Sequence, residues 1–303
     1  MRAPARQTPI AAERSLLRSL LRDPRARVGL IVLAIVALSA IFAPLIAPYD
    51  PAAQLDIVRL QSKPPSLAHP FGTDPFSRDV LSRLLFGSRI SLVVGLGATL
   101  LSIILGITVG AVAGYVGGLT DAVLMRLVDA ALSIPRILVL IMVMTLWGNI
   151  GVLPLTLLMA ATGWFGSSWL VRTQVIALRD RDFVVAARAL GTSPFRVLVR
   201  HVLPNAVAPA LVSATLSIAN VILLEAGLSY LGIGVGPPTA SWGTIIQDGS
   251  ERVTDLWWLT LFPGLAILMT VFACNALGDA LREAFDPRQL PRDATAATLT
   301  PEA

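Results

Sequence analysis

The chain alternates between long apolar segments and shorter polar ones, a pattern typical of a protein that crosses a membrane several times. A helix needs about 20 apolar residues to cross ~30 Å of hydrocarbon at ~1.5 Å per residue. We expect six such spans, at residues 28–47, 90–115, 122–147, 152–171, 206–224 and 256–277. The predicted fold class is therefore all-α, a polytopic membrane protein with six transmembrane helices.

The third of these segments is interrupted by charged residues and a proline. Arg126, Asp129 and Arg136 fall inside it, and Pro135 should kink it. Charges at bilayer depth are costly unless they face protein or water, so this segment should border the interface or an aqueous path. Hydropathy alone would shorten the span to 137–147, which is too short to cross by itself.

The second segment carries a small residue at every fourth position. Small residues let helix backbones approach closely in lipid, where no hydrophobic effect drives association. We therefore expect this face to pack on another helix, in the same chain or in a partner. The stripe consists of Ala98, Ser102, Gly106, Gly110 and Gly114.

The polar segments set the topology. The lead at 1–27 is rich in Arg, and its leucine and arginine spacing favours an interfacial helix or a charged tail on the inner side. Six Arg against two Asp in 172–205 make that loop cytoplasmic by the positive-inside rule. Four crossings from a cytoplasmic N-terminus reach the same side, which leaves 48–89 and 225–255 outside. The transmembrane domain is then 28–281, and a cytoplasmic tail follows at 282–303.

The segment 182–205 is polar for an interior part of this chain and predicts two short helices joined by a turn. Gly191 suits the left-handed position just past a helix end. Ser193 can cap the next helix and Pro194 fits its first position, where no N–H is needed. Pro204 should limit that second helix. A helix pair of this kind is either a docking element or an ordinary cytosolic loop, and spacing alone does not decide.

On the first of these helices, Phe183, Val184, Ala187 and Leu190 fall on one predicted apolar face. His201, near the end of the second helix, is expected to hydrogen-bond there rather than act as a catalytic base.

Composition supports a membrane protein. The chain is 55% hydrophobic and 14% charged, whereas soluble domains carry about 25% charged residues. The net charge of +5 does not indicate nucleic-acid binding, because the cations lie at the ends and in the loops between apolar runs. Cys274 is the single cysteine, so no internal disulfide forms, and its apolar surroundings favour a buried small residue.

Several catalytic chemistries are missing from the sequence. No GxxxxGK[ST] occurs, and Lys63 is the only lysine, so the chain has no P-loop ATP site. With His69 and His201 as the only histidines and no HExxH, a zinc protease site is excluded. There is no G-x-S-x-G nucleophile elbow. We expect no catalytic residue, cofactor or metal site.

Three residues near the outer side are candidates for a transport path or an outer gate. Asn220 lies inside the fifth span, and Glu225 lies at its outer end, where a carboxylate needs water or a partner. A solvated interfacial Glu225 is the equal alternative. Trp242 belongs to the outer loop, whose Gly and Pro content predicts a folded cap.

Four blocks of sequence resemble a known family, the inner-membrane permease subunits of ABC importers. Specifically, the chain resembles the C-type subunit of the dipeptide, oligopeptide and nickel group, which belongs to the binding-protein-dependent transport systems. The blocks are spread along most of the chain, from residue 71 to residue 287, and are specific in combination. They are FGTDPFSRDVLSRLLFGSRISLVVG (71–95), DFVVAARALGTSPFRVLVRHVLPN (182–205), GLSYLGIGVGPPTASWG (227–243) and NALGDALREAFDP (275–287).

The second block resembles the family's "EAA" loop, whose helices dock on a cytoplasmic ATPase. This chain has Val185 where the motif has Glu, so a salt bridge from that position is not available. Ser77 stands where the first block of the family has Gly, so the local turn there can differ. The residues that the resemblance implies for ATPase coupling are Asp182, Phe183, Ala186, Ala187, Gly191, Ser193, Pro194, His201, Leu203 and Pro204.

The resemblance implies a permease subunit in the bacterial cytoplasmic membrane that works by alternating access and moves short peptides. It also implies a second permease chain, two ATPase subunits and an external solute-binding protein. Nickel or another small solute is the alternative cargo. A membrane-embedded enzyme is a hypothesis from another class, but Arg126, Asp129, Asn220 and Glu225 form no catalytic cluster by spacing. A channel or secondary transporter without an ATPase is a third.

Overall fold

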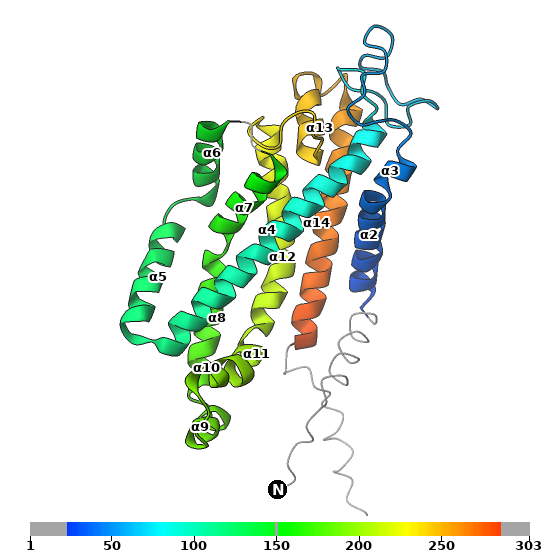
Figure 1. Cartoon of the computed structure of the whole chain (residues 1–303). Helices are drawn as coiled ribbons and strands as arrows, with labels where there is room; N and C mark the ends of the chain where they lie inside the picture. Colours follow the sequence, from blue (N-terminus) through cyan, green and yellow to red (C-terminus); the bar gives the residue numbers. More distant parts are fainter. Residues whose placement is uncertain (1–22, 149–150, 286–303) are drawn as a thin grey trace, which may run out of the picture.

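The computed structural model describes residues 23–148 and 151–285, and these form an elongated bundle of helices with no β-strand among them (Figure 1). Most of the predicted N-terminal segment, 1–27, and most of the predicted tail, 282–303, lie outside the described residues. The all-α fold class is confirmed for the described part of the chain.

The first predicted span corresponds to α2 (Pro24–Ile41), which ends at a break before the short helix α3 (Ala43–Ile46). Asp23 caps α2 by accepting a hydrogen bond from the backbone N–H of Arg25 at 2.8 Å. Pro44 follows the break and fits the first turn of α3, where no N–H donor is needed. The span therefore ends earlier than the predicted 28–47.

The second predicted span lies within α4 (Val80–Val116), a helix of 37 residues that is about 55 Å long at 1.5 Å per residue. It begins ten residues before the predicted start at residue 90, because Asp79 caps it and accepts from the backbone N–H of Ser82 at 2.8 Å. Helix α4 is the centre of the fold and packs against α2, α7, α8 and α12, whose bounds follow below.

The third span is broken, as the proline predicted. Helices α5 (Gly118–Leu132) and α6 (Arg136–Trp147) meet at 77° with Pro135 between them. Pro135 has no N–H to continue the hydrogen-bond ladder of α5, and its fixed φ suits the start of a new helix.

The fourth predicted span, 152–171, is divided at Trp164 into α7 (Val152–Gly163) and α8 (Phe165–Arg179). Helix α8 continues beyond the apolar run, where it packs against α4 and its Arg172 pairs with Asp121 of α5. The fifth span corresponds to α12 (Ala208–Tyr230) and the sixth to α14 (Trp257–Phe285), which runs through Pro263 as one helix.

The outer loop predicted at 225–255 is folded. Its first residues belong to α12, and it then forms α13 (Trp242–Gly249) and the 3-10 turn η2 (Ser250–Arg252). Ser241 and Thr244 form a capping box that starts α13. Figure 1 shows α13 and the loop before α4 at the same end of the bundle.

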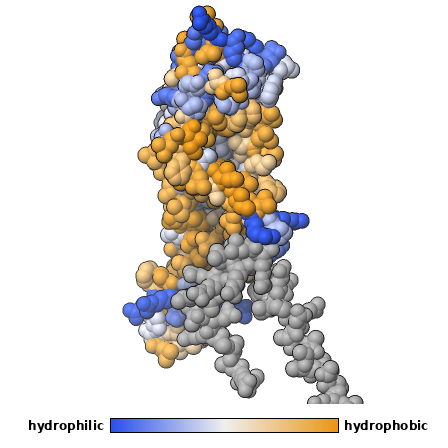
Figure 2. Space-filling model, turned by 90° about the vertical axis from the view of Figure 1, so that its right-hand side faces the viewer, coloured by the Kyte–Doolittle hydropathy of each residue, from blue (hydrophilic) through white to orange (hydrophobic). Residues whose placement is uncertain are grey.

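Four of the described helices, α2, α4, α12 and α14, are long and apolar enough to cross a membrane, and the bent pair α5–α6 makes a fifth if it counts as one span. Helix α7 is apolar but short. Figure 2 shows hydrophobic residues over the middle of the molecule and hydrophilic residues gathered toward its two ends. The chain is therefore a multi-pass helical membrane protein.

The small-residue stripe of α4 faces α7 and α8 of the same chain. Ser102 donates a hydrogen bond to the carbonyl of Ala160 on α7 at 3.0 Å. A Cβ added at Gly110 would lie 2.3 Å from the carbonyl oxygen of Ser168, and one at Gly114 would lie 2.8 Å from that of Arg172. The α4 and α8 backbones can approach this closely only because these positions lack side chains.

The variant Gly110→Ala is expected to lower the melting temperature of the purified protein in detergent. The added methyl group meets backbone atoms that cannot rotate away, and overpacking of this kind costs about 1–3 kcal/mol. Gly264→Ala is the matched control, because Gly264 also lies inside a helix but has no neighbour within 4 Å of the added Cβ. Equal melting temperatures for the two variants would contradict the close contact of α4 with α8.

Candidate functional site

The predicted coupling segment forms a set of short helices at one end of the bundle, the end at which α2 begins (Figure 1). It consists of α9 (Asp182–Ala189), α10 (Pro194–Val197), the π-helical turn η1 (Leu198–Val202) and α11 (Leu203–Ala206). We call this set, from residue 182 to residue 206, the coupling loop.

The turn inside the coupling loop has the geometry that its glycine favours. Gly191 has φ +79°, its N–H donates to the carbonyl of Arg188 at 2.9 Å, and the N–H of Thr192 donates to that of Ala187 at 3.2 Å. This pair of bonds is the Schellman motif, which closes a helix with a left-handed residue. Ser193 and Pro194 occupy the N-cap and first positions of α10, but the Ser193 side chain makes no capping hydrogen bond.

Pro204 does not limit the second helix, which corrects the sequence prediction. The π turn before it shifts the hydrogen-bond register, so the N–H of Leu203 donates to the carbonyl of Leu198 and the chain continues into α11. Pro204 then lies in the first turn of α11, where its missing N–H is not needed. The carbonyl of His201 is satisfied by the Asn205 side-chain amide at 2.7 Å.

The coupling loop has one face toward the bundle and one toward solvent. Val184, Ala187, Val197 and Val202 are buried in a cluster that also holds Val171 and Val175 of α8. The predicted apolar face is wrong in part, because Phe183 and Leu190 point outward with Val185, Ala186 and Phe195. Leu190 is 86% exposed and Phe195 is 76% exposed. The bundle covers only one side of these short helices, and large apolar side chains remain on the other.

Polar contacts hold the coupling loop and the end of α8 to the ends of α4 and α5. The Arg188 guanidinium lies over the Tyr115 ring, 5.4 Å from its centroid. Arg179 donates to the carbonyl of Gly114 at 3.0 Å. The guanidinium of Arg172 makes two hydrogen bonds to the Asp121 carboxylate, at 2.5 and 2.6 Å. These contacts connect the coupling loop and the end of α8 to α4 and α5.

Two of the three outer candidates pack inside the protein. Glu225 is fully buried within α12 rather than solvated at its end, and it accepts hydrogen bonds from Ser91 at 3.0 Å and Ser229 at 2.8 Å. Trp242 is 1% exposed, and its indole N–H donates to the carbonyl of Leu84 at 3.3 Å. Both residues join α4 to α12 and α13. Only Asn220 is exposed, at the edge of a polar cavity within the bundle.

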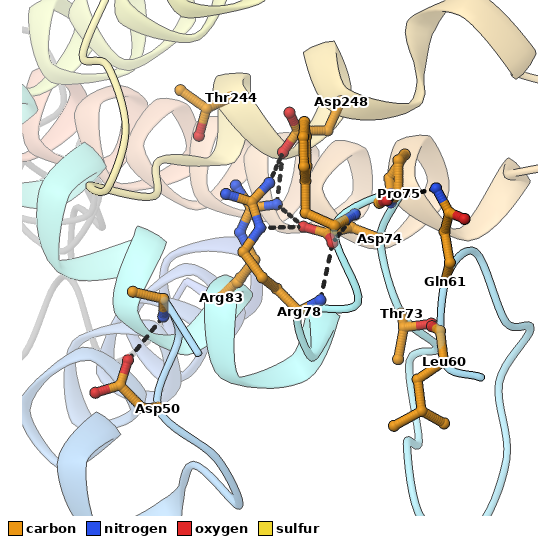
Figure 3. A network of polar contacts seen from close by, with 12 residues as sticks. Asp50, Leu60, Gln61, Thr73, Asp74, Pro75, Arg78, Arg83, Thr244 and Asp248 are labelled. Atoms are coloured by element: carbon orange, nitrogen blue, oxygen red, sulfur yellow. Dashed lines mark hydrogen bonds and ion pairs between the residues drawn. The ribbon is translucent and has the colours of Figure 1, made fainter. Parts of the chain in front are cut away.

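The sequence did not predict a buried ionic cluster that lies between the loop before α4 and α13 (Figure 3). Asp74 is paired with Arg78 at 2.6 Å and with Arg83, and both arginines also pair with Asp248 of α13. Asp74 is fully buried and Arg83 is 3% exposed. The signal available was the charge density of the first resemblance block, TDPFSRDVLSR. Asp248, which pairs with Arg78 and Arg83, lies about 170 residues further along the chain, so sequence spacing could not link it to them.

Ser77 adopts the backbone conformation that the family glycine would favour. Its φ is +61°, its side chain is buried, and its hydroxyl donates to the carbonyl of Asp56 at 2.8 Å. A nonglycine residue is uncommon at positive φ, and this hydrogen bond offsets part of the cost.

A larger cavity of about 820 Å³ lies between the ionic cluster, the end of α6 and the segment 232–237. Among the described residues, no group of three His, Cys, Asp or Glu side chains could hold a metal ion.

Comparison with known proteins identifies this helical membrane protein as a transport permease. Residues 106–290 match the family described as the inner membrane component of binding-protein-dependent transport systems. Residues 14–65 match the N-terminal transmembrane domain of oligopeptide transport permease C. The chain belongs to this family of permeases, as its sequence blocks indicated.

Similar proteins carry peptide transport in their names. A putative peptide transport system permease protein of Brucella abortus is 42% identical over 273 residues, 89% of this chain and 90% of the relative. The oligopeptide transport system permease protein OppC of Bacillus subtilis is 39% identical over 87% of this chain and 85% of its own length. The dipeptide transport system permease protein DppC of the same organism is 36% identical over 89% and 84%.

Proposed function

We propose that this chain is one of two permease subunits of an ATP-driven importer of di- and oligopeptides in the bacterial cytoplasmic membrane. The observation that carries the proposal is the coupling loop. Its inner face belongs to the bundle core, and its outer face presents Phe183, Leu190 and Phe195 to solvent. Large apolar side chains on short helices at the end of a bundle are suited to a partner surface.

The mechanism proposed is alternating access. Two partner ATPase subunits close on ATP, and the coupling loop moves with them because it binds the closed and open forms differently. Arg188 of the loop passes this movement to Tyr115 of α4. The adjoining helix α8 passes it on through Arg179, which contacts Gly114 of α4, and through Arg172, which contacts Asp121 of α5. A solute-binding protein delivers the peptide at the outer end.

Six crossings are part of this proposal, with α7 and α8 together as the fourth. The start of α2 and the coupling loop lie at the same end of the bundle, which four crossings between them require (Figure 1). Both termini are then cytoplasmic, and the loops before α4 and after α12 face outward.

The test is purification of the tagged chain from its native membrane, followed by identification of the chains that accompany it. We expect a second permease and ATPase subunits, and ATP-dependent uptake of a labelled dipeptide into proteoliposomes once the solute-binding protein is added. Uptake of Ni²⁺ in place of peptide would show that the cargo is nickel and not a peptide. A lone chain that transports without an ATPase would contradict the proposal.

A further inference from the structure

A small polar cavity lies inside the bundle where α4, α6, α8 and α12 converge, apart from the coupling loop and the ionic cluster. Its volume is about 170 Å³, roughly six times the ~30 Å³ that one water occupies in the liquid. Hydrogen-bonding side chains line it from each of these helices: Thr99, Ser102, Arg136, Ser167, Ser217 and Asn220. Asn220 is the exposed member of this set.

Arg136 brings a positive charge to this cavity that no carboxylate balances. Its Nη2 donates to the carbonyl of Met159 at 2.7 Å and its Nε to the hydroxyl of Thr162 at 3.1 Å. Within residues 23–148 and 151–285, no Asp or Glu lies at ion-pair distance from it, and its Nη1 donates no hydrogen bond. An arginine has five donors, so the group keeps unused ones.

The position of Arg136 makes this charge costly without an anion. It is the first residue of α6, at the positive end of the helix dipole, where a cation is unfavourable. After the 77° bend, α6 begins about midway along the bundle, away from both polar ends (Figure 1). An ionisable residue at such depth is generally functional and has a partner.

Thr99 supplies a second and independent observation. It is 3% exposed, it lines the same cavity, and its hydroxyl oxygen has no hydrogen-bond partner within the part of the chain described. A buried hydroxyl without a partner costs about 1–3 kcal/mol. An anionic ligand in the cavity removes the unbalanced charge, and a rotation of the Thr99 side chain about χ1 brings its enclosed hydroxyl to the same ligand.

We propose that Arg136, Thr99 and the neighbouring hydroxyls bind the terminal carboxylate of the peptide while it crosses the membrane. This inference rests on the proposed function. A carboxylate matches the guanidinium fork, and hydroxyl and amide donors can fill its remaining lone pairs. The cavity accepts only one end of a peptide, and the C-terminal carboxylate is the acidic group that all peptides share. The site therefore holds the cargo without selecting its side chains.

The experiment compares a dipeptide of neutral side chains with its C-terminal amide. Uptake is measured in proteoliposomes that hold the whole complex, with a peptide pair that the solute-binding protein carries at saturation in both forms. Arg136→Gln should slow uptake of the free acid about tenfold or more, the equivalent of one charged hydrogen bond, and leave that of the amide within about twofold. Arg136→Lys should restore part of the preference for the acid. Thr99→Val should reduce the preference by a smaller factor.

Arg126→Gln is the matched control, because Arg126 is an exposed arginine in the other half of the same bent pair. It should leave both uptake rates unchanged. Equal slowing of acid and amide by Arg136→Gln, or loss of the second permease from the purified complex, would overturn the inference. The latter result would assign the cavity to a carboxylate of the partner chain. Absence of ATP-driven uptake in the wild type would instead reject the proposed function.

Discussion

The variant Asp74→Asn is expected to destabilise the protein by about 3–5 kcal/mol, the usual cost of breaking a buried ion pair from one side. The Oδ1 atom of Asp74 accepts from the backbone N–H groups of Phe76 and Arg78, and an asparagine can keep these bonds. Its Oδ2 atom faces Arg78 and Arg83, and an amide nitrogen there would set donors against donors (Figure 3). The measurement is the melting temperature of the purified protein.

Asp180→Asn is the control for Asp74→Asn, because it removes the same charge from an exposed pair. The Asp180 side chain is 72% exposed and lies 3.4 Å from Arg179, so its loss should cost at most about 1 kcal/mol. Hydrogen exchange should also rise in α13 of the Asp74 variant, since Asp248 and the arginines tie that helix to the outer loop. Equal melting of the two variants would show that the cluster does not hold the outer end together.

Features that depend on neighbouring residues in the sequence were predictable. Pro135 breaks the third span because a proline removes a hydrogen bond of its own helix, whatever surrounds it. Gly191 takes a left-handed conformation for an equally local reason. The long apolar segments correctly predicted helices, because hydropathy averaged over ~20 residues needs no tertiary information.

Features that depend on distant parts of the chain were not predictable. Glu225 was assigned to the outer end of a span. In the structure it is buried and accepts a hydrogen bond from Ser91, which lies 134 residues away in the sequence. Pro204 was expected to end a helix, but a π turn before it changes the hydrogen-bond register. Helix α7 ends at Trp164 within an apolar run that showed no boundary. For Glu225 the decisive hydrogen bond comes from a distant helix, whereas the π turn and the end of α7 are changes of hydrogen-bond register that spacing did not reveal.

The neighbours of the candidate site residues also depend on the fold and were not predictable from the sequence. The sequence placed Arg136 in the third span and expected it to border water or protein. Only the structure brings Thr99 and Asn220 into one cavity with it. Likewise, the fold selects which side of α9 is covered, and Phe183 and Leu190 are left outside. The sequence showed which residues are charged or apolar, but only the fold shows which residues lie next to them.

The variant Gly191→Pro is expected to reduce the rate of peptide uptake tenfold or more. ATP hydrolysis by the partner subunits and insertion of the chain into the membrane should remain. Proline fixes φ near −65°, whereas Gly191 has φ +79°, and it removes the N–H that bonds to Arg188. The turn between α9 and α10 then cannot form, and the two helices lose the relative orientation that docking requires. The measurements are ATP hydrolysis and labelled peptide uptake by the same proteoliposomes.

A graded series at this position separates the turn from general damage. No atom lies within 4 Å of a Cβ added at Gly191, so a side chain there meets only the backbone cost of the left-handed conformation. That cost is about 1–2 kcal/mol for alanine and less for asparagine, which visits this conformation more readily. Uptake should therefore fall in the order glycine, asparagine, alanine, proline, with the assembled complex recovered in each case. Wild-type uptake by the proline variant would remove the coupling loop from the mechanism.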